Sequence, residues 1–395
     1  MKKLFVLLLL FAVSQSQAQV KDPFPYKFSS SIYENIKSDS NSWRGGKTSS
    51  DLSFIGLYKE ALQEWDKARP YKRKVSREDS IDFVKTYKPV DARTFILKKA
   101  KENRVIIFNE AHYNPRHRVF VTSLLEDLKK AGFTHFAAET FSTRPAFKEN
   151  SQYPNLNTGY YSMEPQFGNL IREANRLNYS LYPYEQSSGG QQQQRETGQA
   201  KNLARLLDSL PGSKVIVYCG FAHIGEYPIE GWAIPMAAML KELTGIDPYT
   251  IDQTVLAERS RGDLDHPYFT IADVKKYAIF TDKKGNPFNK KLDDKKVNAF
   301  LFAPATNYIH NRPDWIFENG KKAFFLNKDS VNVSYPFLAK VYFKETDIEN
   351  IVIPADMMEI RSPQELAETA LAVFKKRKFI VQLIDTEGKT QVIKP

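Results

Sequence analysis

The chain has 395 residues, of which 42% are hydrophobic and 26% charged, so it is long enough for one large domain and a smaller one. Its formal net charge of +11 comes from lysines and arginines spread over many segments, which argues against a nucleic-acid-binding protein. The single cysteine, Cys219, has no partner for an internal disulfide, so stability has to come from packing.

The N-terminal residues 1–18 have the pattern of a secretory signal peptide. Lys2 and Lys3 precede an apolar run over residues 4–13, and the following Ser-Gln-Ala fits cleavage after Ala18. Removing this segment lowers the formal charge by two, to +9. The run is too short to span a bilayer, and no later stretch approaches the roughly 20 apolar residues of a transmembrane helix. We therefore expect an exported protein, periplasmic or extracellular, that is soluble after cleavage and has no transmembrane anchor.

Residues 19–95 mix aromatic and charged side chains, and the spacing in SFIGLYKEALQEWDKA and SIDFVKTY predicts helices. We expect an N-terminal helical cap here.

Residues 96–260 alternate short apolar runs with amphipathic segments. Alternation at this spacing predicts an α/β core domain with a mainly parallel sheet and helices on both faces. A polar insert, SSGGQQQQ at 187–194, is expected to be an unpacked loop. The expected strands are RVIIF, THFAAET, YSLYPYE, KVIVYCG and DPYTIDQT, and the expected helices are NPRHRVFVTSLLEDLKKAG, EPQFGNLIREANRLN, ETGQAKNLARLLDSLPG and GWAIPMAAMLKELTG.

Residues 261–395 change to short strand-like pieces and predict a smaller C-terminal α+β module. We expect a hairpin in DWIFENGKKAFFL that turns at Asn319-Gly320, and another in KFIVQLIDTEGKTQVIKP. Ser362 and Glu365 fit a capping box before an amphipathic helix, ELAETALAVFKK. Nothing in this module predicts chemistry, and we expect it to pack against the core domain or shape access to it.

Polar side chains stand where the predicted core strands end, and parallel sheets bind ligands beyond the carboxyl ends of their strands. We therefore expect these side chains to gather in one hollow. His117 should lie on the inward face of the next helix, whose dipole favours the neutral, metal-binding imidazole. The residues at the strand ends are Glu110, His112, Glu139, Glu185, His223 and Glu226.

The order and spacing of three motifs, NEAH with a second histidine at 117, FAAE, and GFAH, resemble a superfamily of erythromycin esterases, ChaN-like haem-binding proteins and TraB/Tiki metallopeptidases. The spacing of Glu110, His112 and His117 is most similar to the ChaN-like branch, and GFAH to a motif shared with the Tiki branch. Arg195 is similar to an arginine that opens a helix before the last motif. The resemblance covers about residues 96–255, and Asn109 stands where these families have a glycine.

Two classes of function fit this pattern. In the first, the protein hydrolyses an ester or peptide bond of a small-molecule or peptide substrate. His112, His223 and Glu139 would hold a divalent metal ion of the zinc or manganese class that activates water. Glu110 would be the general base, and Arg195 would clamp an oxyanionic group. The esterase resemblance also implies a metal-free variant, in which a glutamate and a histidine activate the water directly.

In the second class, which the ChaN-like resemblance implies, His112 and His117 ligate haem iron for iron acquisition, without turnover. A third possibility is an exported scaffold whose pocket is idle. Haem needs one or two axial donors and apolar walls, whereas Glu110, Glu139 and Glu185 would place acids beside the histidines, so hydrolysis is favoured. In the alternative interpretation of the weaker candidates, Glu185 and Glu226 are ordinary loop charges and Arg195 is a surface residue.

Overall fold

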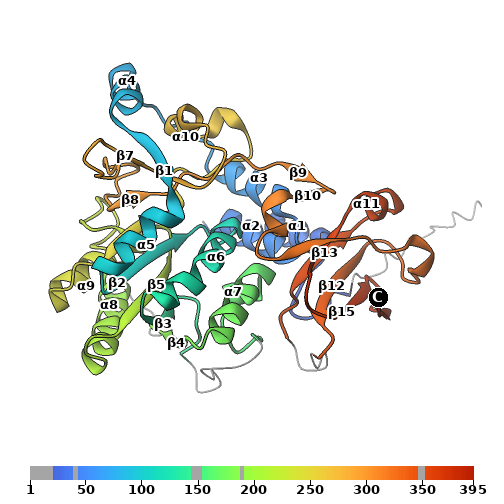
Figure 1. Cartoon of the computed structure of the whole chain (residues 1–395). Coiled ribbons are helices and arrows are strands. Elements are labelled where there is room, and N and C mark those ends of the chain that lie inside the picture. The colour runs from blue at the N-terminus through green and yellow to red at the C-terminus, as the bar shows by residue number, and fades with distance from the viewer. Residues whose placement is uncertain (1–20, 39–42, 144–153, 187–190, 346–351) are drawn as a thin grey trace, which may run out of the picture.

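The computed structural model describes residues 21–38, 43–143, 154–186, 191–345 and 352–395 (Figure 1). Its centre is a six-stranded sheet in the order β4-β3-β5-β2-β6-β8, and all five strand pairings are parallel. This confirms the predicted α/β class. The strands are β2 (Val105–Glu110), β3 (Phe133–Ala138), β4 (Ser180–Pro183), β5 (Lys214–Gly220), β6 (Tyr249–Asp252) and β8 (Ala299–Phe300).

Helices cover both faces of this sheet, as predicted. Alternate residues of β2 point to opposite faces, so Ile106 and Phe108 join one apolar cluster and Val105 and Ile107 join the other. The first cluster lies under α5 (Ala92–Glu102), α6 (Arg116–Lys130) and α7 (Pro165–Arg176), and the second lies under α8 (Gln192–Ser209) and α9 (Met236–Thr244).

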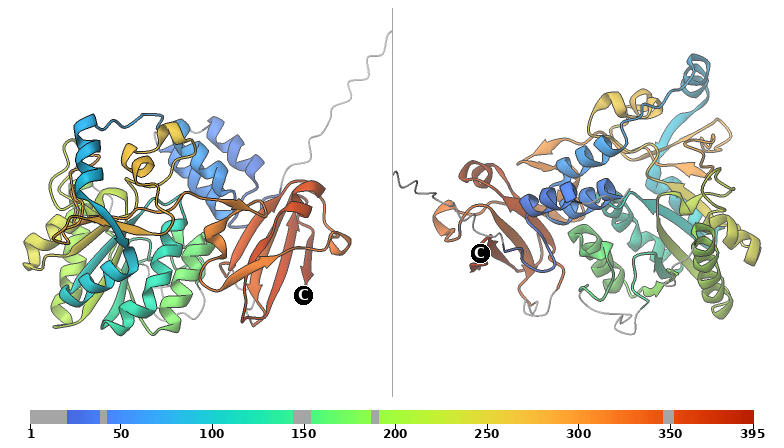
Figure 2. Two further views of the ribbon diagram at one scale, coloured as in Figure 1. Left: turned by 45° about the horizontal axis from the view of Figure 1, so that its top comes forward. Right: turned by 180° about the vertical axis from the view of Figure 1, so that it is seen from behind.

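The N-terminal region is helical as predicted, and its helices α1 and α2 pack against the C-terminal strands (Figure 2). The predicted helix over residues 53–68 is two helices. They are separated at Gly56, whose φ of +80° suits glycine and whose Cβ would meet Met357 O at 2.1 Å. The elements of this region are α1 (Ser29–Ser38), α2 (Arg44–Phe54), α3 (Tyr58–Ala68), α4 (Arg77–Thr86) and β1 (Lys88–Asp91).

The C-terminal module contains a four-stranded antiparallel sheet in the order β13-β12-β15-β16, beside a two-stranded pair of β11 and β14. The terminal hairpin is confirmed as β15 and β16, and the Ser362 hydroxyl accepts the predicted capping bond from Glu365 N. The elements are η4 (Asp314–Phe317), β11 (Lys321–Phe324), β12 (Phe337–Phe343), β13 (Asp356–Ile360), α11 (Pro363–Glu368), β14 (Leu371–Phe374), β15 (Phe379–Asp385) and β16 (Thr390–Ile393).

Short elements lie between the main helices and strands in both parts of the chain. The core sheet takes its last strand from beyond the predicted boundary at residue 260, because β8 pairs with β6, and β7 pairs with β1. The short elements are η1 (Tyr161–Met163), η2 (Phe221–Ile224), η3 (Gly262–Leu264), α10 (Pro267–Ala272), β7 (Ala278–Thr281), β9 (Tyr308–Ile309), β10 (Arg312–Pro313) and η5 (Lys328–Ser330).

Two further predictions in the C-terminal module are wrong in part. The helix expected over residues 365–376 ends at Glu368, and Leu371–Phe374 form β14 because they pair with β11. Asn319 and Gly320 do form a turn, with φ of 56° and 78°, but residues 314–317 before it are a 3₁₀ turn and no strand. In both places a partner distant in sequence overrides the local pattern.

The polar insert at 187–194 was expected to be an unpacked loop, but its described residues, 191–194, are packed. Gln192 to Gln194 form the first turn of α8, and the Gln193 side chain accepts a hydrogen bond from Ile234 N at 2.8 Å. Residues 187–190 of the insert lie outside the described residues, and so does the predicted signal peptide at 1–18. Within the described ranges, the search for membrane-crossing helices finds none of sufficient length and apolarity.

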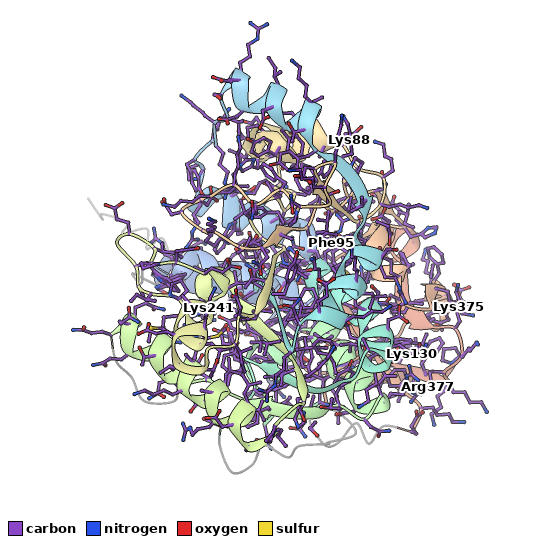
Figure 3. The ribbon with its side chains drawn as sticks, turned by 60° about the vertical axis from the view of Figure 1, so that its left-hand side comes forward. Lys88, Phe95, Lys130, Lys241, Lys375 and Arg377 are labelled. Atoms are coloured by element: carbon purple, nitrogen blue, oxygen red, sulfur yellow. The ribbon has the colours of Figure 1, made fainter. Side chains whose placement is uncertain are left out.

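The positive charges are not evenly spread. Figure 3 shows Lys88 and Lys241 in separate places, and Lys130, Lys375 and Arg377 on one side. Lys375, Lys376 and Arg377 line a cleft together with Arg93, Arg172 and Arg176.

Candidate functional site

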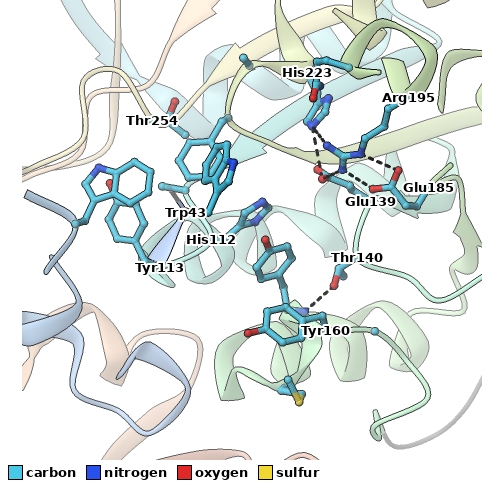
Figure 4. A pocket seen from close by; sticks show the side chains of 18 of the residues that line it. Trp43, His112, Tyr113, Glu139, Thr140, Tyr160, Glu185, Arg195, His223 and Thr254 are labelled. Carbon is cyan, nitrogen blue, oxygen red and sulfur yellow. Dashed lines mark hydrogen bonds and ion pairs between the residues drawn. The ribbon is translucent and has the colours of Figure 1, made fainter. Parts of the chain in front are cut away.

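A cleft of about 1200 Å³ opens beyond the carboxyl ends of β2, β3 and β5 (Figure 4). Five of the predicted site residues line it: His112, Glu139, Glu185, Arg195 and His223. Segments more than a hundred residues apart therefore meet in one hollow, because parallel strands end on the same edge of the sheet.

Glu110 is the last residue of β2 and fixes the ring of His112 from behind. Its Oε1 lies 2.8 Å from His112 Nδ1, and its two oxygens also accept 2.6 and 2.7 Å bonds from Arg118. Burial raises the pKa of Glu110, but Arg118 and His112 outweigh it and hold that pKa far below its usual value. An ionised Glu110 accepts a hydrogen bond from the Nδ1–H group, so the lone pair of the neutral His112 ring is on Nε2.

Arg118 is held on its other side by a second buried carboxylate. Its Nη1 lies 3.0 Å from Glu164 Oε2, and both side chains are fully buried. Glu164 also accepts bonds from Tyr58 Oη and from Phe167 N, where it caps α7. Glu110, Arg118 and Glu164 thus form a buried, hydrogen-bonded chain behind the ring of His112.

Aromatic rings fix the faces of His112. Tyr161 stacks on it with a centroid distance of 3.6 Å and an angle of 11°, and Phe221 meets it edge-on at 5.1 Å. Position 220 leaves room for the ring, since a Cβ on Gly220 would lie 2.6 Å from His112 Nε2. The Nε2 edge of the ring therefore lies beside Gly220 at the end of β5, and His112 lines the cleft.

Glu139 follows β3 and lies between the two histidines of the site. Its Oε2 accepts a 2.5 Å bond from Gly220 N, and its Oε1 lies 3.6 Å from His223 Nε2. Burial raises the pKa of Glu139, but the positive charges of His223, His112 and Arg195 outweigh it and lower the pKa to about 2. Glu139 is therefore an anion at neutral pH.

Arg195 projects from the first turns of α8 into the middle of this group. Its guanidinium donates to Glu139 and Glu185, and its Nη1 lies 3.1 Å from His223 Nε2. Glu185 accepts a further bond from Gln199 Nε2 at 2.9 Å. These four contacts use four of the five N–H groups of the arginine, so among the described residues one N–H has no partner and can donate to a ligand.

His223 lies in η2, directly after β5, and is buried. Its Nδ1 donates to Glu196 at 2.7 Å from Oε1, and Glu196 also caps α9 by accepting from Met236 N. Burial lowers the pKa of His223, but Glu139 and Glu196 outweigh it, so the pKa is raised. The neutral ring accepts from Arg195, and the protonated ring has Glu139 Oε1 within reach.

Besides Glu110, which lies behind His112, two predicted residues lie outside the cleft. His117 is buried behind β2, where its Nδ1 accepts from Ala111 N at 3.0 Å, and burial lowers its pKa to about 4. The sequence predicted a neutral imidazole from the helix dipole, but burial is the main cause of the lowered pKa. Glu226 bonds to Thr250 Oγ1, and burial raises its pKa. Neither side chain lines the cleft.

Asn109 stands where the families that the sequence resembles have a glycine, and its side chain has a structural role. It lies inside β2, is fully buried, and its Nδ2 donates to Phe221 O at 2.7 Å and to Asp252 Oδ2 at 2.6 Å. Its Oδ1 accepts from Gln253 N. The amide therefore ties the ends of β2, β5 and β6 together beneath the cleft.

Three residues that hold the site were not predicted: Arg118, Glu164 and Glu196. Arg118 stands three and seven residues before Val121 and Leu125, so helical spacing alone would have placed it on a buried face. Glu164 precedes a proline at a helix start, which is a capping pattern. Glu196 has no such signal beyond its position next to Arg195.

The donor set predicted for a metal ion, His112, His223 and Glu139, does not fit one as arranged. The guanidinium of Arg195 contacts both His223 and Glu139, and a divalent cation there would face its positive charge. Within the described ranges no three His, Cys, Asp or Glu side chains are grouped in a way that could hold a metal ion. The metal ion stays a prediction from sequence.

His112 and His117 cannot ligate one haem in this arrangement, because His117 lies outside the cleft that His112 lines. His112 could supply one axial nitrogen, but Glu139, Glu185 and Arg195 share its walls. Haem pockets are mainly apolar, so this lining suits polar chemistry better.

Neither a protein-family model nor a curated protein matches the chain. Several solved structures do, at low similarity. The type III effector HopBA1 has 12% identity and a TM-score of 0.34, over 56% of this chain and 97% of that one. The C-terminal region of Pasteurella multocida toxin has 14% identity and a TM-score of 0.32, over 57% and 33%.

A third match is RRSP, a MARTX toxin effector domain from Vibrio vulnificus, with 13% identity and a TM-score of 0.29 over 63% and 56%. This chain thus spans a third of the Pasteurella multocida structure and about half of the Vibrio vulnificus one. Likenesses at this level carry no argument about function, and the superfamily resemblance stays a prediction.

Proposed function

We propose that the protein is a hydrolase of an acyl bond, an ester or a peptide amide, with His112 as general base and His223 as general acid. The observation that carries this proposal is the setting of His112. Its Nδ1 is bound to Glu110, its Nε2 lies beside Gly220, and the side chain lines the cleft. A carboxylate that fixes the tautomer of an imidazole and stabilises the imidazolium is the arrangement of hydrolytic histidine bases.

The proposed nucleophile is a water molecule activated by His112 Nε2. Among the described residues, Glu110 is the one side chain that hydrogen-bonds the ring of His112, so no hydroxyl or thiol of the chain is paired with it. Cys219 is buried, contacts Phe108 O, and has a pKa that burial raises further. A thiol in that state is a poor nucleophile.

This proposal moves the general base from Glu110, where the sequence placed it, to His112. Both oxygens of Glu110 already accept hydrogen bonds from Arg118, and its pKa is far below the range of a base at neutral pH. Glu110 acts through His112 and is a positioning residue.

Glu139 and Arg195 would stabilise the charges of the reaction. Glu139 lies beside both imidazoles, so its negative charge favours the imidazolium that forms when His112 takes a proton. The remaining N–H of Arg195 can donate to the developing oxyanion. His223, whose pKa is raised, would protonate the leaving group.

We also infer export, from Lys2, Lys3 and the apolar run that follows them. Mass spectrometry of secreted protein tests this: the mature chain should begin at Gln19. An intact N-terminus in secreted protein would contradict the inference.

Rates on panels of esters and peptides, measured for wild type, His112→Ala and Glu110→Gln, test the proposed function. We expect losses of about 10² to 10⁴ in kcat for both variants. His135→Ala is the matched control, since His135 lies at the opposite end of β3 and outside the cleft. Cleavage by His112→Ala at the wild-type rate would refute the assignment.

A further inference from the structure

The cleft continues away from His112 along a floor of aromatic rings. Phe221, which meets His112 edge-on at 5.1 Å, stacks on Trp65 with a centroid distance of 5.2 Å and an angle of 9°. Trp65 also stacks on Tyr113 at 4.3 Å. Figure 4 shows Tyr113 on one side of His112 and Arg195 with Glu185 on the other. The cleft therefore has an acidic end and an aromatic end.

Arg69 closes the aromatic end. It directly follows α3, and its guanidinium lies 3.8 Å from the Trp65 ring centroid and 5.6 Å from that of Trp43. In the part of the chain that the structure describes, no carboxylate contacts this guanidinium and no acceptor hydrogen-bonds to it. Burial, reinforced by the charge of Arg259, lowers the pKa of Arg69. A bound anion would compensate the unpaired charge.

The other cations that line the cleft differ from Arg69 in this respect, since each of them contacts a carboxylate of the chain. The pairs are Arg73 with Asp293, Arg259 with Asp66, Lys295 with Asp252, and Arg195 with Glu139 and Glu185. Among the described residues, Arg69, at the aromatic end, is therefore the lining cation that remains available to a ligand.

We propose that Arg69 binds a carboxylate of the substrate, and that Trp65 and Tyr113 pack against the chain that joins this carboxylate to the scissile bond. The inference rests on the proposed hydrolase function. A single guanidinium carries one positive charge and two parallel donors, which match a carboxylate. A phosphate dianion would call for a second free cation. The substrate class is an acyl compound with a distant carboxylate, such as an acidic peptide.

The distance between the two ends limits the length of the substrate. Successive contacts from Arg69 through Trp65 and Phe221 to His112 span 3.8, 5.2 and 5.1 Å. An extended peptide advances roughly 3.3 to 3.6 Å per residue, so about four residues or an acyl chain of that length suffice. Because the three contacts need not lie on one line, their sum is an upper limit of the separation, and a shorter substrate can also reach both groups.

p-Nitrophenyl monoesters of linear dicarboxylic acids, from succinic to dodecanedioic acid, test this inference. Each ester is compared with its ω-carboxamide, which has the same shape but no charge. We expect kcat/KM to favour the acid by about fivefold to tenfold, with a maximum at one chain length, because the site is only partly shielded from water. Arg69→Gln should remove the preference, and Arg69→Lys should keep part of it.

Arg77→Gln is the matched control, since Arg77 is exposed on α4 and outside the cleft. Its acid-to-amide ratio should equal that of wild type. A wild-type ratio of one at every chain length, or a preference unchanged in Arg69→Gln, would overturn the inference.

A binding measurement separates this inference from the proposed function. Free dicarboxylic acids and their diamides are titrated while tryptophan fluorescence is followed, since Trp65 and Trp43 flank Arg69. Quenching by the acids that Arg69→Gln abolishes supports the anion site even if no ester is cleaved. Cleavage without acid-specific quenching or preference would leave the hydrolase standing and refute the site.

Discussion

The ring of His112 occupies the space that a side chain at Gly220 would need, because a Cβ there would lie 2.6 Å from Nε2. The backbone of Gly220 has φ of −86° and ψ of 146°, which any residue can adopt. The requirement for glycine at this position therefore comes from the imidazole and not from the turn.

Gly220→Ala should lower kcat by about 10², because a shift of about 1 Å in a catalytic group has a cost of that size. Far-ultraviolet circular dichroism should show the wild-type fold. Gly262→Ala is the control, since its Cβ would meet only Asp265 Oδ2, at 3.8 Å. Wild-type kcat in Gly220→Ala would show that the ring of His112 is free to move.

Glu196→Gln should shift the alkaline limb of the rate profile to lower pH. Glu196 is one of the groups that raise the pKa of His223, so the neutral amide lets that pKa fall. A general acid must be protonated, and activity is therefore lost at a lower pH than in wild type. Profiles of kcat/KM against pH measure the shift. An unchanged limb, with activity retained, would remove His223 from the role of general acid.

His117 should make the fold sensitive to mild acid. Burial lowers its pKa from 6.5 to about 4 in the folded protein, so the folded state binds fewer protons than the unfolded state between these values. Its contribution is complete above pH 6.5 and is lost as the pH falls toward 4, by up to about 3 kcal/mol. Urea unfolding across this range measures the loss.

His117→Asn keeps an acceptor for Ala111 N and cannot titrate, so this variant should show a smaller fall in the free energy of unfolding over the same range. A fall identical to that of wild type would assign the acid sensitivity to other groups.

Arg118→Met should destabilise the protein by about 3 to 5 kcal/mol, because it leaves Glu110 and Glu164 as uncompensated buried charges. Arg176→Met is the control, since the pair of Arg176 with Glu173 is largely exposed and should contribute about 1 kcal/mol or less. Urea unfolding compares the two variants. Equal stabilities would mean that the Glu110–Arg118–Glu164 chain is not needed for folding.

Metal analysis and haem titration discriminate between the alternatives from sequence. If the arrangement around Arg195 is the functional one, protein purified without chelators should retain its activity in EDTA, and added haem should give no strong Soret shift. One equivalent of zinc or manganese that is lost in His112→Ala would restore the metal-assisted route. A Soret shift lost in the same variant would favour the binding protein.

The alternation of apolar runs and amphipathic segments was sufficient to predict the parallel sheet, because burial on both faces makes central strands continuously apolar. His112, Glu139 and His223 could be expected in one hollow, because parallel strands end on the same edge of the sheet, and Glu110 lies directly behind them. The strand at 371–374 could not be predicted, since it forms by pairing with residues 321–324, which are distant in sequence.

The sequence by itself determined the α/β class, the strand ends and the polar residues that follow them, because these depend on periodicity and chain order. Only the tertiary structure decided what each of those residues touches. It paired Glu110 with Arg118, placed Arg195 among the acids, and separated His117 from the cleft. Side-chain charge and protonation depend on neighbours within a few ångströms, and those neighbours come from segments that no local pattern connects.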